Sequence, residues 1–194
     1  NMFKAWYFPF YNYGIIHGDP HLGNYSSDEK GNINLLDFGC IRIFKPSFVK
    51  GVIDLYYAIK NNNQELAVHA YQSWGFENIS NDMIEILNIW AKFLYSPLME
   101  NKVRKMQDTN STTYGAEAAA KVHKELKRIG GVKPPREFVF MDRAAIGLGS
   151  VFLHLNAEVN WYNLFHNLIK NFNEKALNKK QKTVLQKFKI KRNF

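Results

Sequence analysis

The chain has 194 residues, of which 46% are hydrophobic, and this length and composition predict about one domain with a substantial core. A single cysteine, Cys40, excludes an internal disulfide. No apolar stretch approaches the roughly 18 residues that a membrane-spanning helix needs, so such a segment is excluded. Most of the net charge of +9 lies in residues 173–194, which hold eight basic residues and one acid. Because the rest of the chain carries little charge and no recognition motif, we expect no nucleic-acid partner.

The first elements in chain order are a helix end and a hairpin. Residues 4–13 are rich in aromatic side chains and predict the end of a helix, which Pro9 should kink or reduce to an irregular turn before Gly14 ends it. Residues 34–37 predict a short buried strand, and residues 28–32 predict the turn of a β-hairpin. The motif described below therefore lies around a strand, a turn and a second strand.

The remainder of the chain has a helical pattern. Apolar residues recur at helical spacing in residues 46–61, in residues 64–74 and, after the capping residue Ser80, as far as residue 95. Residues 107–114 are polar and predict a loop, and residues 116–129 predict a helix that Gly130 and Gly131 stop. The prolines at 134 and 135 should open the next helix, and residues 158–169 predict a last apolar helix. The expected fold class is mainly α (α+β).

Two motifs carry the predicted chemistry. In HGDPHLGN, Asp19 precedes Asn24 by five positions, which is the spacing of the protein-kinase catalytic loop, and the triplet from Asp37 matches the metal-binding turn that follows that loop. We expect Asp37 and Asn24 to hold magnesium between nucleotide phosphates through hard oxygen ligands. Asp19 is the expected catalytic residue, which would orient or deprotonate the attacking hydroxyl or water.

Supporting roles are expected for the neighbours of these residues. His17 should brace the loop by hydrogen-bonding backbone near the Asp37 turn, and Phe38 and Gly39 should brace the turn itself. His21 occupies the place of the lysine that follows the kinase catalytic aspartate, so we expect it to contact substrate or the terminal phosphate. Aspartate-phenylalanine-glycine alone is a common turn, and only its combination with the loop at the correct distance indicates a kinase-like site.

The segments HGDPHLGNY, INLLDFGCIRIF and PPREFVFMDRAAIGLGSVFLHL resemble the UbiB/ADCK (AarF-related) family of atypical kinases over about residues 13–169. The resemblance implies a protein-kinase-like fold, of which residues 1–172 would form the C-lobe, with a short β-hairpin at the active site followed by a helical bundle. It also implies ATP and Mg²⁺ as cofactors, a kinase or ATPase reaction, and a role in ubiquinone or isoprenoid lipid biosynthesis with an isoprenoid or quinone lipid as partner.

Three departures from the family pattern limit the comparison. The chain has no glycine-rich or alanine-rich nucleotide loop, no strand lysine with a helix glutamate, and no lysine-glycine-glutamine motif. We therefore expect the N-terminal lobe to be absent from this chain, and the chain alone to be an incomplete, inactive fragment. Leu22 stands where the motif usually has proline.

Two other functions remain open from the sequence. Small-molecule phosphotransferases of the aminoglycoside or choline kinase type share the histidine-glycine-aspartate loop, although the basic residues Arg42, Lys45 and Lys50 argue against a cationic acceptor. A pseudokinase scaffold that binds lipid is the alternative without catalysis. No alanine-proline-glutamate anchor follows Gly39, which disfavours a protein substrate.

The basic tail, residues 173–194, has its own pattern. Leu177, Val184, Leu185 and Phe188 recur at helical spacing among lysines, which is typical of an amphipathic helix at a membrane surface, although a frayed, solvated terminus is the alternative. We expect a cytoplasmic protein that contacts the membrane peripherally through this tail.

Overall fold

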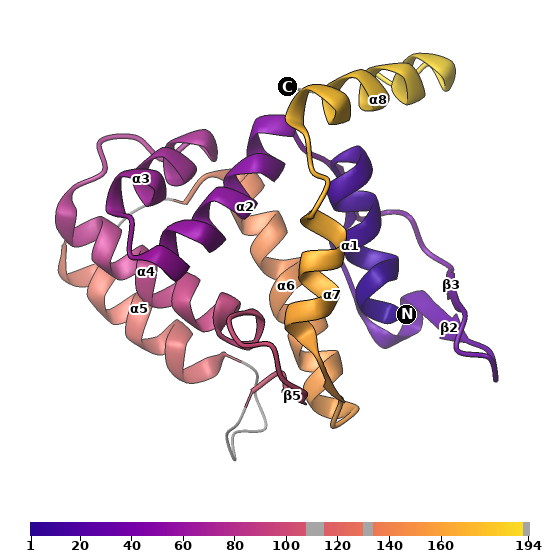
Figure 1. The fold of residues 1–194 in the computed structure, drawn as a ribbon, viewed down its shortest axis with the longest axis horizontal. Coiled ribbons are helices and arrows are strands. Elements are labelled where there is room, and N and C mark those ends of the chain that lie inside the picture. Colours follow the sequence, from indigo (N-terminus) through magenta and orange to yellow (C-terminus); the bar gives the residue numbers. More distant parts are fainter. Residues whose placement is uncertain (108–114, 130–133, 192–194) are drawn as a thin grey trace.

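A computed structural model describes residues 1–107, 115–129 and 134–191 as a mainly helical assembly with short strands (Figure 1). The helices within these ranges are α1 (Met2–Tyr13), α2 (Pro46–Asn61), α3 (Gln64–Ser73), α4 (Asn81–Tyr95), α5 (Ala116–Arg128), α6 (Arg136–His154), α7 (Trp161–Ile169) and α8 (Glu174–Lys187). Three antiparallel two-stranded sheets join β1 (Ile15–His17) to β4 (Ile41–Ile43), β2 (Tyr25–Ser27) to β3 (Ile33–Leu35), and β5 (Arg104–Lys105) to β6 (Glu158–Val159). The mainly helical fold class is confirmed.

Helix α1 is continuous through Pro9, so the irregular turn expected there is wrong. Pro9 has no N–H to donate to the carbonyl of Ala5, but burial of Trp6 and Phe10 on one face holds the helix together. Gly14 ends it as expected, with φ of 66° and its N–H donating to Phe10 O at 2.9 Å. A side chain at Gly14 would also approach Phe44 O to 2.8 Å, so both backbone conformation and space require glycine.

The predicted hairpin is present as β2 and β3, and in Figure 1 it projects from the helical body. Its turn is fixed by Asp28, whose carboxylate accepts hydrogen bonds from the backbone N–H groups of Lys30 and Asn32 and from the Asn32 side chain. These hydrogen bonds, and most of all the one from the Asn32 side chain, lower the pKa of Asp28 below its usual range. The strand expected to be buried at 34–37 is Ile33–Leu35 instead, and it is not buried: Asn34 is exposed, and Ile33 and Leu35 are half-buried.

Helix boundaries set by local capping agree with the sequence predictions. Ser80 accepts a hydrogen bond from Met83 N at 3.2 Å and starts α4, and α6 begins after Pro135. The last apolar helix begins at Trp161 rather than at 158, because Glu158 and Val159 pair with β5. Of the loop predicted at 107–114, all residues after Gln107 lie outside the described residues. The glycines at 130 and 131 lie outside them too.

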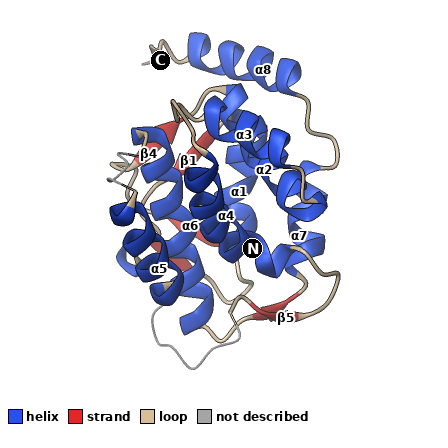
Figure 2. Cartoon of the chain, turned by 90° about the vertical axis from the view of Figure 1, so that its left-hand side faces the viewer, coloured by secondary structure: helices blue, strands red, loops and turns tan. Residues whose placement is uncertain are grey.

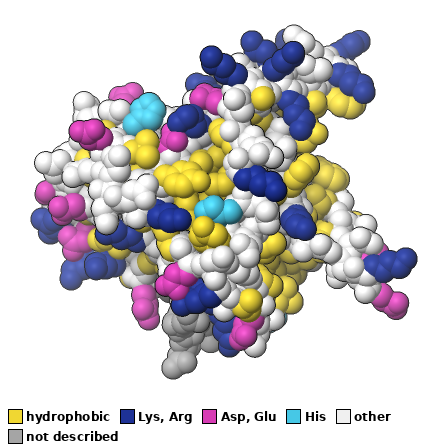
Figure 3. All heavy atoms as spheres, viewed as in Figure 1, with side chains coloured by type: hydrophobic (Ala, Val, Ile, Leu, Met, Phe, Trp, Pro, Cys, Tyr) yellow, Lys and Arg dark blue, Asp and Glu magenta, His cyan; other side chains and the backbone are white. Residues whose placement is uncertain are grey.

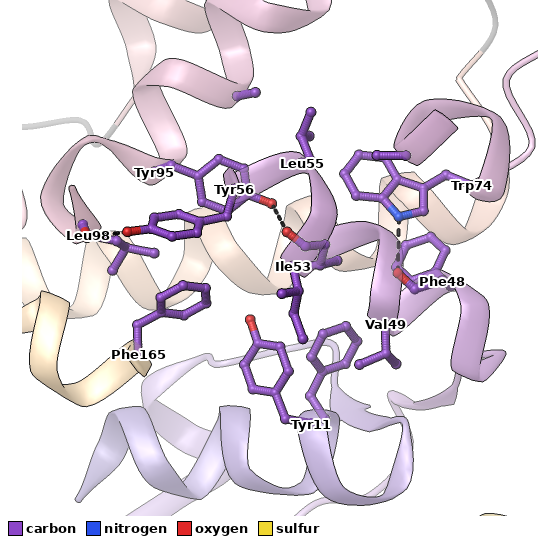
Figure 4. Packing of buried hydrophobic residues seen from close by; sticks show 14 of the residues in the cluster. Tyr11, Phe48, Val49, Ile53, Leu55, Tyr56, Trp74, Tyr95, Leu98 and Phe165 are labelled. Atoms are coloured by element: carbon purple, nitrogen blue, oxygen red, sulfur yellow. Dashed lines mark hydrogen bonds between the residues drawn. The ribbon is translucent and has the colours of Figure 1, made fainter. Parts of the chain in front are cut away.

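The core lies where α1, α2, α3, α4, α6 and α7 meet, and it is rich in aromatic side chains (Figure 4). Two of its tyrosine hydroxyls donate to backbone carbonyls: Tyr56 Oη donates to Leu98 O at 3.2 Å and Tyr95 Oη donates to Val52 O at 2.8 Å. Burying such hydroxyls with acceptors avoids the cost of an unpaired polar group. This core fixes the helices that support the candidate site.

Helix α8 of the basic tail packs against α1 and α2 (Figures 1 and 2). Gln181 is 1% exposed, and its Nε2 donates to Tyr13 O at 2.8 Å and to Phe44 O at 2.9 Å. Leu177 and Leu185 are buried beside it. A helix in the tail is confirmed, but two of the four apolar residues predicted for a membrane-facing side pack against the protein, and Phe188, which follows the end of α8, is 63% exposed.

None of the described helices combines the length and the apolar content that crossing a bilayer requires.

Candidate functional site

The two motifs meet because β1 pairs with β4 (Figure 2). His17 at the end of β1 lies opposite Ile41 at the start of β4. The loop that follows β1 and the Asp37 turn that precedes β4 therefore lie at the same end of this sheet. Gly18 N donates to Cys40 O at 2.9 Å there. The sequence did not reveal this pairing, because three-residue strands separated by a hairpin carry almost no pattern of their own.

His17 links the loop to the turn from a buried position. Its Nδ1 accepts a hydrogen bond from Asp19 N at 3.2 Å, which leaves Nε2 to carry the proton and donate to Asp37 O. Trp6 Nε1 donates to His17 O at 2.9 Å, so the same residue is also anchored to α1. This is the contact with the Asp37 turn that the sequence predicted for His17.

Asn24 contacts Asp19 directly. Asn24 Nδ2 donates to Asp19 O at 3.2 Å and to Asp19 Oδ2 at 3.1 Å. Leu36 N donates to Asn24 O at 2.9 Å, which ties this short 3-10 turn, η1 (Leu22–Asn24), to the segment that leads into Asp37. Because Nδ2 is used by Asp19, the amide oxygen of Asn24 is the atom left for a cation.

Asp37 is exposed, and its Oδ1 accepts a hydrogen bond from Gly39 N at 2.7 Å. A Cβ atom at Gly39 would lie 3.1 Å from that oxygen, so a larger residue would crowd the Asp37 side chain. The ring of Phe38 is 61% exposed, so Phe38 contributes to the turn through its carbonyl, which accepts from Ile41 N at 3.3 Å, rather than through its ring. Cys40 is partly buried.

The described residues contain no cluster of three or more His, Cys, Asp or Glu side chains that could hold a metal ion. Asp37 and Asn24 offer one carboxylate and one amide oxygen, which are the hard ligands that Mg²⁺ prefers. Mg²⁺ usually keeps few protein ligands and fills its remaining positions with water and substrate phosphates. The donor set therefore fits a magnesium ion that arrives with a nucleotide, and does not fit an all-protein metal cage.

His21 lies at the edge of a cleft that the sequence did not predict. Its Nδ1 accepts a hydrogen bond from Gly23 N at 3.1 Å, and the exposed ring lines a cleft of 760 Å³ between the loop 18–22 and α6. Arg143 of α6 lines the same cleft. Arg143 lies in one of the segments that resemble the UbiB/ADCK family, but no role is predicted for it from the sequence.

A second feature outside the predicted site is the partly buried side chain of Asp142, which lines an apolar cavity of 90 Å³. Trp90 Nε1 donates to Asp142 Oδ1 at 2.5 Å. Burial raises the pKa of Asp142 to about 6, and the hydrogen bond from Trp90 offsets only part of this shift. The ionisation of Asp142, which lies next to Arg143 on α6, should therefore make the stability of the fold depend on pH.

We expect Asp142→Asn to stabilise the protein at neutral pH. The folded-state pKa lies above the ordinary value of 3.8, so the stabilisation from the protonated carboxyl is complete below about pH 4 and is lost as pH rises through about 6. Asparagine carries no charge and can still accept from Trp90. The gain should approach about 3 kcal/mol above pH 7, since one pKa unit corresponds to about 1.4 kcal/mol.

Urea unfolding of Asp142→Asn and the unmodified protein at pH 4.5 and pH 8 measures this difference. The exposed carboxylate Glu77 offers the control, since Glu77→Gln should change stability little at either pH. A stability difference between Asp142→Asn and the unmodified protein that does not grow with pH would contradict the prediction.

A mainly helical chain in which Asp19, Asn24 and the Asp37 turn are joined by hydrogen bonds has the features expected of an atypical kinase-like domain. Residues 1–71 match the family model of the ABC1 atypical kinase-like domain, and these residues include the whole candidate site from His17 to Gly39. The match supports the resemblance to the UbiB/ADCK family at this coarse level.

A similar curated protein is an uncharacterized protein of Synechocystis sp., which is 27% identical over 110 residues. The aligned region covers 54% of this chain and 19% of the cyanobacterial protein. The chain therefore spans about a fifth of the length of the relative that it matches.

Proposed function

We propose that the protein is a UbiB/ADCK-type atypical kinase or ATPase that binds Mg-ATP. The observation that carries the proposal is the hydrogen-bonded unit in which His17 bonds both Asp19 and the Asp37 turn while Asn24 bonds the Asp19 carboxylate. Such a unit holds the catalytic loop and the metal-binding turn together before any ligand arrives. The match of residues 1–71 to the ABC1 atypical kinase-like domain supports the same class.

The residues divide the chemistry among them. Asp37 and Asn24 would hold a magnesium ion, which would supply positive charge to offset the negative charge of the nucleotide phosphates. Asp19 orients the attacking hydroxyl or water and accepts its proton as the new oxygen–phosphorus bond forms and the bond to ADP breaks. The bond from Asn24 Nδ2 fixes the orientation of the Asp19 carboxylate. His21, which lines the cleft, is assigned a contact with the acceptor or the terminal phosphate.

Calorimetric titration of ATP into the full-length protein, with magnesium and with a chelator in its place, tests the proposal. We expect saturable binding that requires magnesium. Absence of binding in both conditions would contradict the proposal and favour the lipid-binding pseudokinase scaffold. Magnesium-dependent binding together with phosphorylation of an aminoglycoside or choline would instead favour the small-molecule phosphotransferase.

The resemblance also motivates a proposed role in ubiquinone or isoprenoid lipid biosynthesis. Chromatographic measurement of quinone content in cells that lack the protein tests this role, and an unchanged content would contradict it.

We further propose that the tail contacts an anionic membrane surface through the lysines of α8. Figure 3 shows basic side chains gathered on this helix, and Lys175, Lys179 and Lys182 are exposed on the side away from buried Leu177 and Leu185. A lysine near an anionic leaflet contributes about 1 kcal/mol. Replacing the three lysines with glutamine should therefore weaken binding to anionic vesicles by roughly 100-fold at low salt.

Vesicle co-sedimentation of the full-length protein measures this loss. These substitutions leave the docking of Gln181 intact, whereas deletion of the tail would uncover its two carbonyl partners. The matched control replaces three exposed lysines of α5, Lys121, Lys124 and Lys127, with glutamine. Equal loss in both triple variants would mean that overall charge, and not α8, drives binding.

A further inference from the structure

The cleft beside the catalytic loop has one wall from α6. Arg143, Gly147, Ser150, Val151 and His154 line this wall, and their spacing of three or four residues places them along one face of the helix. The opposite wall is the loop from Gly18 to Leu22, and the cleft volume is 760 Å³. A cleft of this size accommodates a small organic molecule.

Gly147 fixes the distance between α6 and the loop. A Cβ atom at this position would lie 2.4 Å from Pro20 Cγ, so the helix approaches the catalytic loop as closely as a glycine permits. Ala144 and Leu148 are buried, which anchors α6 in the core. The position of the cleft wall relative to Asp19 is therefore set by packing, and not by a mobile surface segment.

The cleft includes Asp19 but not the expected magnesium ligands. Its lining includes Asp19 and His21, but neither Asn24 nor Asp37 contributes to it. The expected magnesium ligands thus lie outside the cleft lining, whereas the expected catalytic residue Asp19 is part of it. This is the arrangement required of an acceptor site, because the acceptor hydroxyl must reach Asp19 from a direction that the nucleotide does not occupy.

The charge of the cleft selects the acceptor. Asp19 is the single acid among the described residues that line it, whereas Arg143 contributes a permanent positive charge. Arg143 is exposed and has no ion pair or side-chain hydrogen bond within the described residues, unlike Arg128, which pairs with Glu125 at 2.9 Å. The N–H groups of its guanidinium can therefore form a bidentate pair of hydrogen bonds with a phosphate or carboxylate. Leu22, Ile146 and Val151 add apolar surface beside it.

We propose that Arg143 binds the anionic group of the phosphoryl acceptor, a small molecule with an apolar body and a hydroxyl group that reaches Asp19. This inference rests on the proposed function. The acceptor oxygen forms the new bond to the terminal phosphorus, its proton passes to Asp19, and the bond from that phosphorus to ADP breaks. Arg143 holds the acceptor and takes no part in the proton transfer.

Binding of n-hexyl phosphate to the full-length protein, measured by calorimetry without nucleotide or magnesium, tests the proposal. We expect Arg143→Gln to weaken binding about ten-fold or more, because a charge-assisted bidentate contact is lost. Arg143→Lys should retain part of the affinity as a point charge. The matched control is Arg128→Gln, which removes an exposed arginine outside the cleft and should leave the affinity unchanged. 1-Hexanol, which lacks the anion, should bind weakly to all variants.

Equal affinity of Arg143→Gln and the unmodified protein for n-hexyl phosphate would overturn the proposal. Displacement of the probe by saturating Mg-ATP would also overturn it, because Arg143 would then contact the nucleotide phosphates. Titration of Mg-ATP into the same samples separates this result from failure of the proposed function. Probe binding that depends on Arg143 without any Mg-ATP binding would retain the anion site and reject the kinase or ATPase role.

Discussion

Replacing Asp19 with asparagine in the full-length protein should reduce turnover by about 10²- to 10⁴-fold while nucleotide affinity stays nearly unchanged, since these are the losses typical of a missing general base. Asparagine cannot accept the proton of the attacking hydroxyl or water. Its side-chain oxygen can still accept the hydrogen bond that Asn24 Nδ2 now donates to Asp19 Oδ2. The loop should therefore keep its conformation, and the lost function should be chemical.

Phosphate release from ATP measures the turnover of Asp19→Asn, and calorimetric titration of Mg-ATP measures its binding. Asp54→Asn is a matched control, because Asp54 pairs with Lys50 on α2, outside the site. A variant Asp19→Asn that loses binding and turnover equally would show Asp19 to be a metal ligand or a structural residue.

Replacing Asp37 with asparagine should abolish the magnesium-dependent part of nucleotide binding. Asp37 supplies the carboxylate among the expected ligands, and a neutral amide holds Mg²⁺ much more weakly than a carboxylate does. The substituted side chain can still accept from Gly39 N, as Asp37 Oδ1 does at 2.7 Å, so the turn should persist. We expect nucleotide affinity in magnesium to fall at least about ten-fold, to the level measured without metal.

Titration of ATP into Asp37→Asn and the unmodified protein, each with magnesium and with a chelator, gives the four affinities needed. The two proteins should agree in the chelator, which is the internal control for folding. If magnesium strengthens binding equally in both proteins, Asp37 is not a ligand. If Asp37→Asn is also weaker in the chelator, the turn itself supports the nucleotide site.

The sequence by itself determined most helix boundaries and the identity of the candidate site residues. Helix ends depend on groups three or four residues apart, as in the bond from Met83 N to Ser80, so they can be predicted locally. The spacing of Asp19, Asn24 and Asp37 is likewise a property of the chain alone. Local rules failed where distant packing prevailed, as at Pro9, where burial of neighbouring aromatic side chains keeps the helix intact.

Only the tertiary structure decided how these residues meet and what surrounds them. The pairing of β1 with β4 brings the Asp37 turn to His17, and the contact of Gly147 with Pro20 places α6 and Arg143 beside Asp19. Gln181 similarly bonds carbonyls of residues 13 and 44, far away in the sequence. Such contacts depend on the packing of whole helices, and a single sequence carries no periodic signal for them.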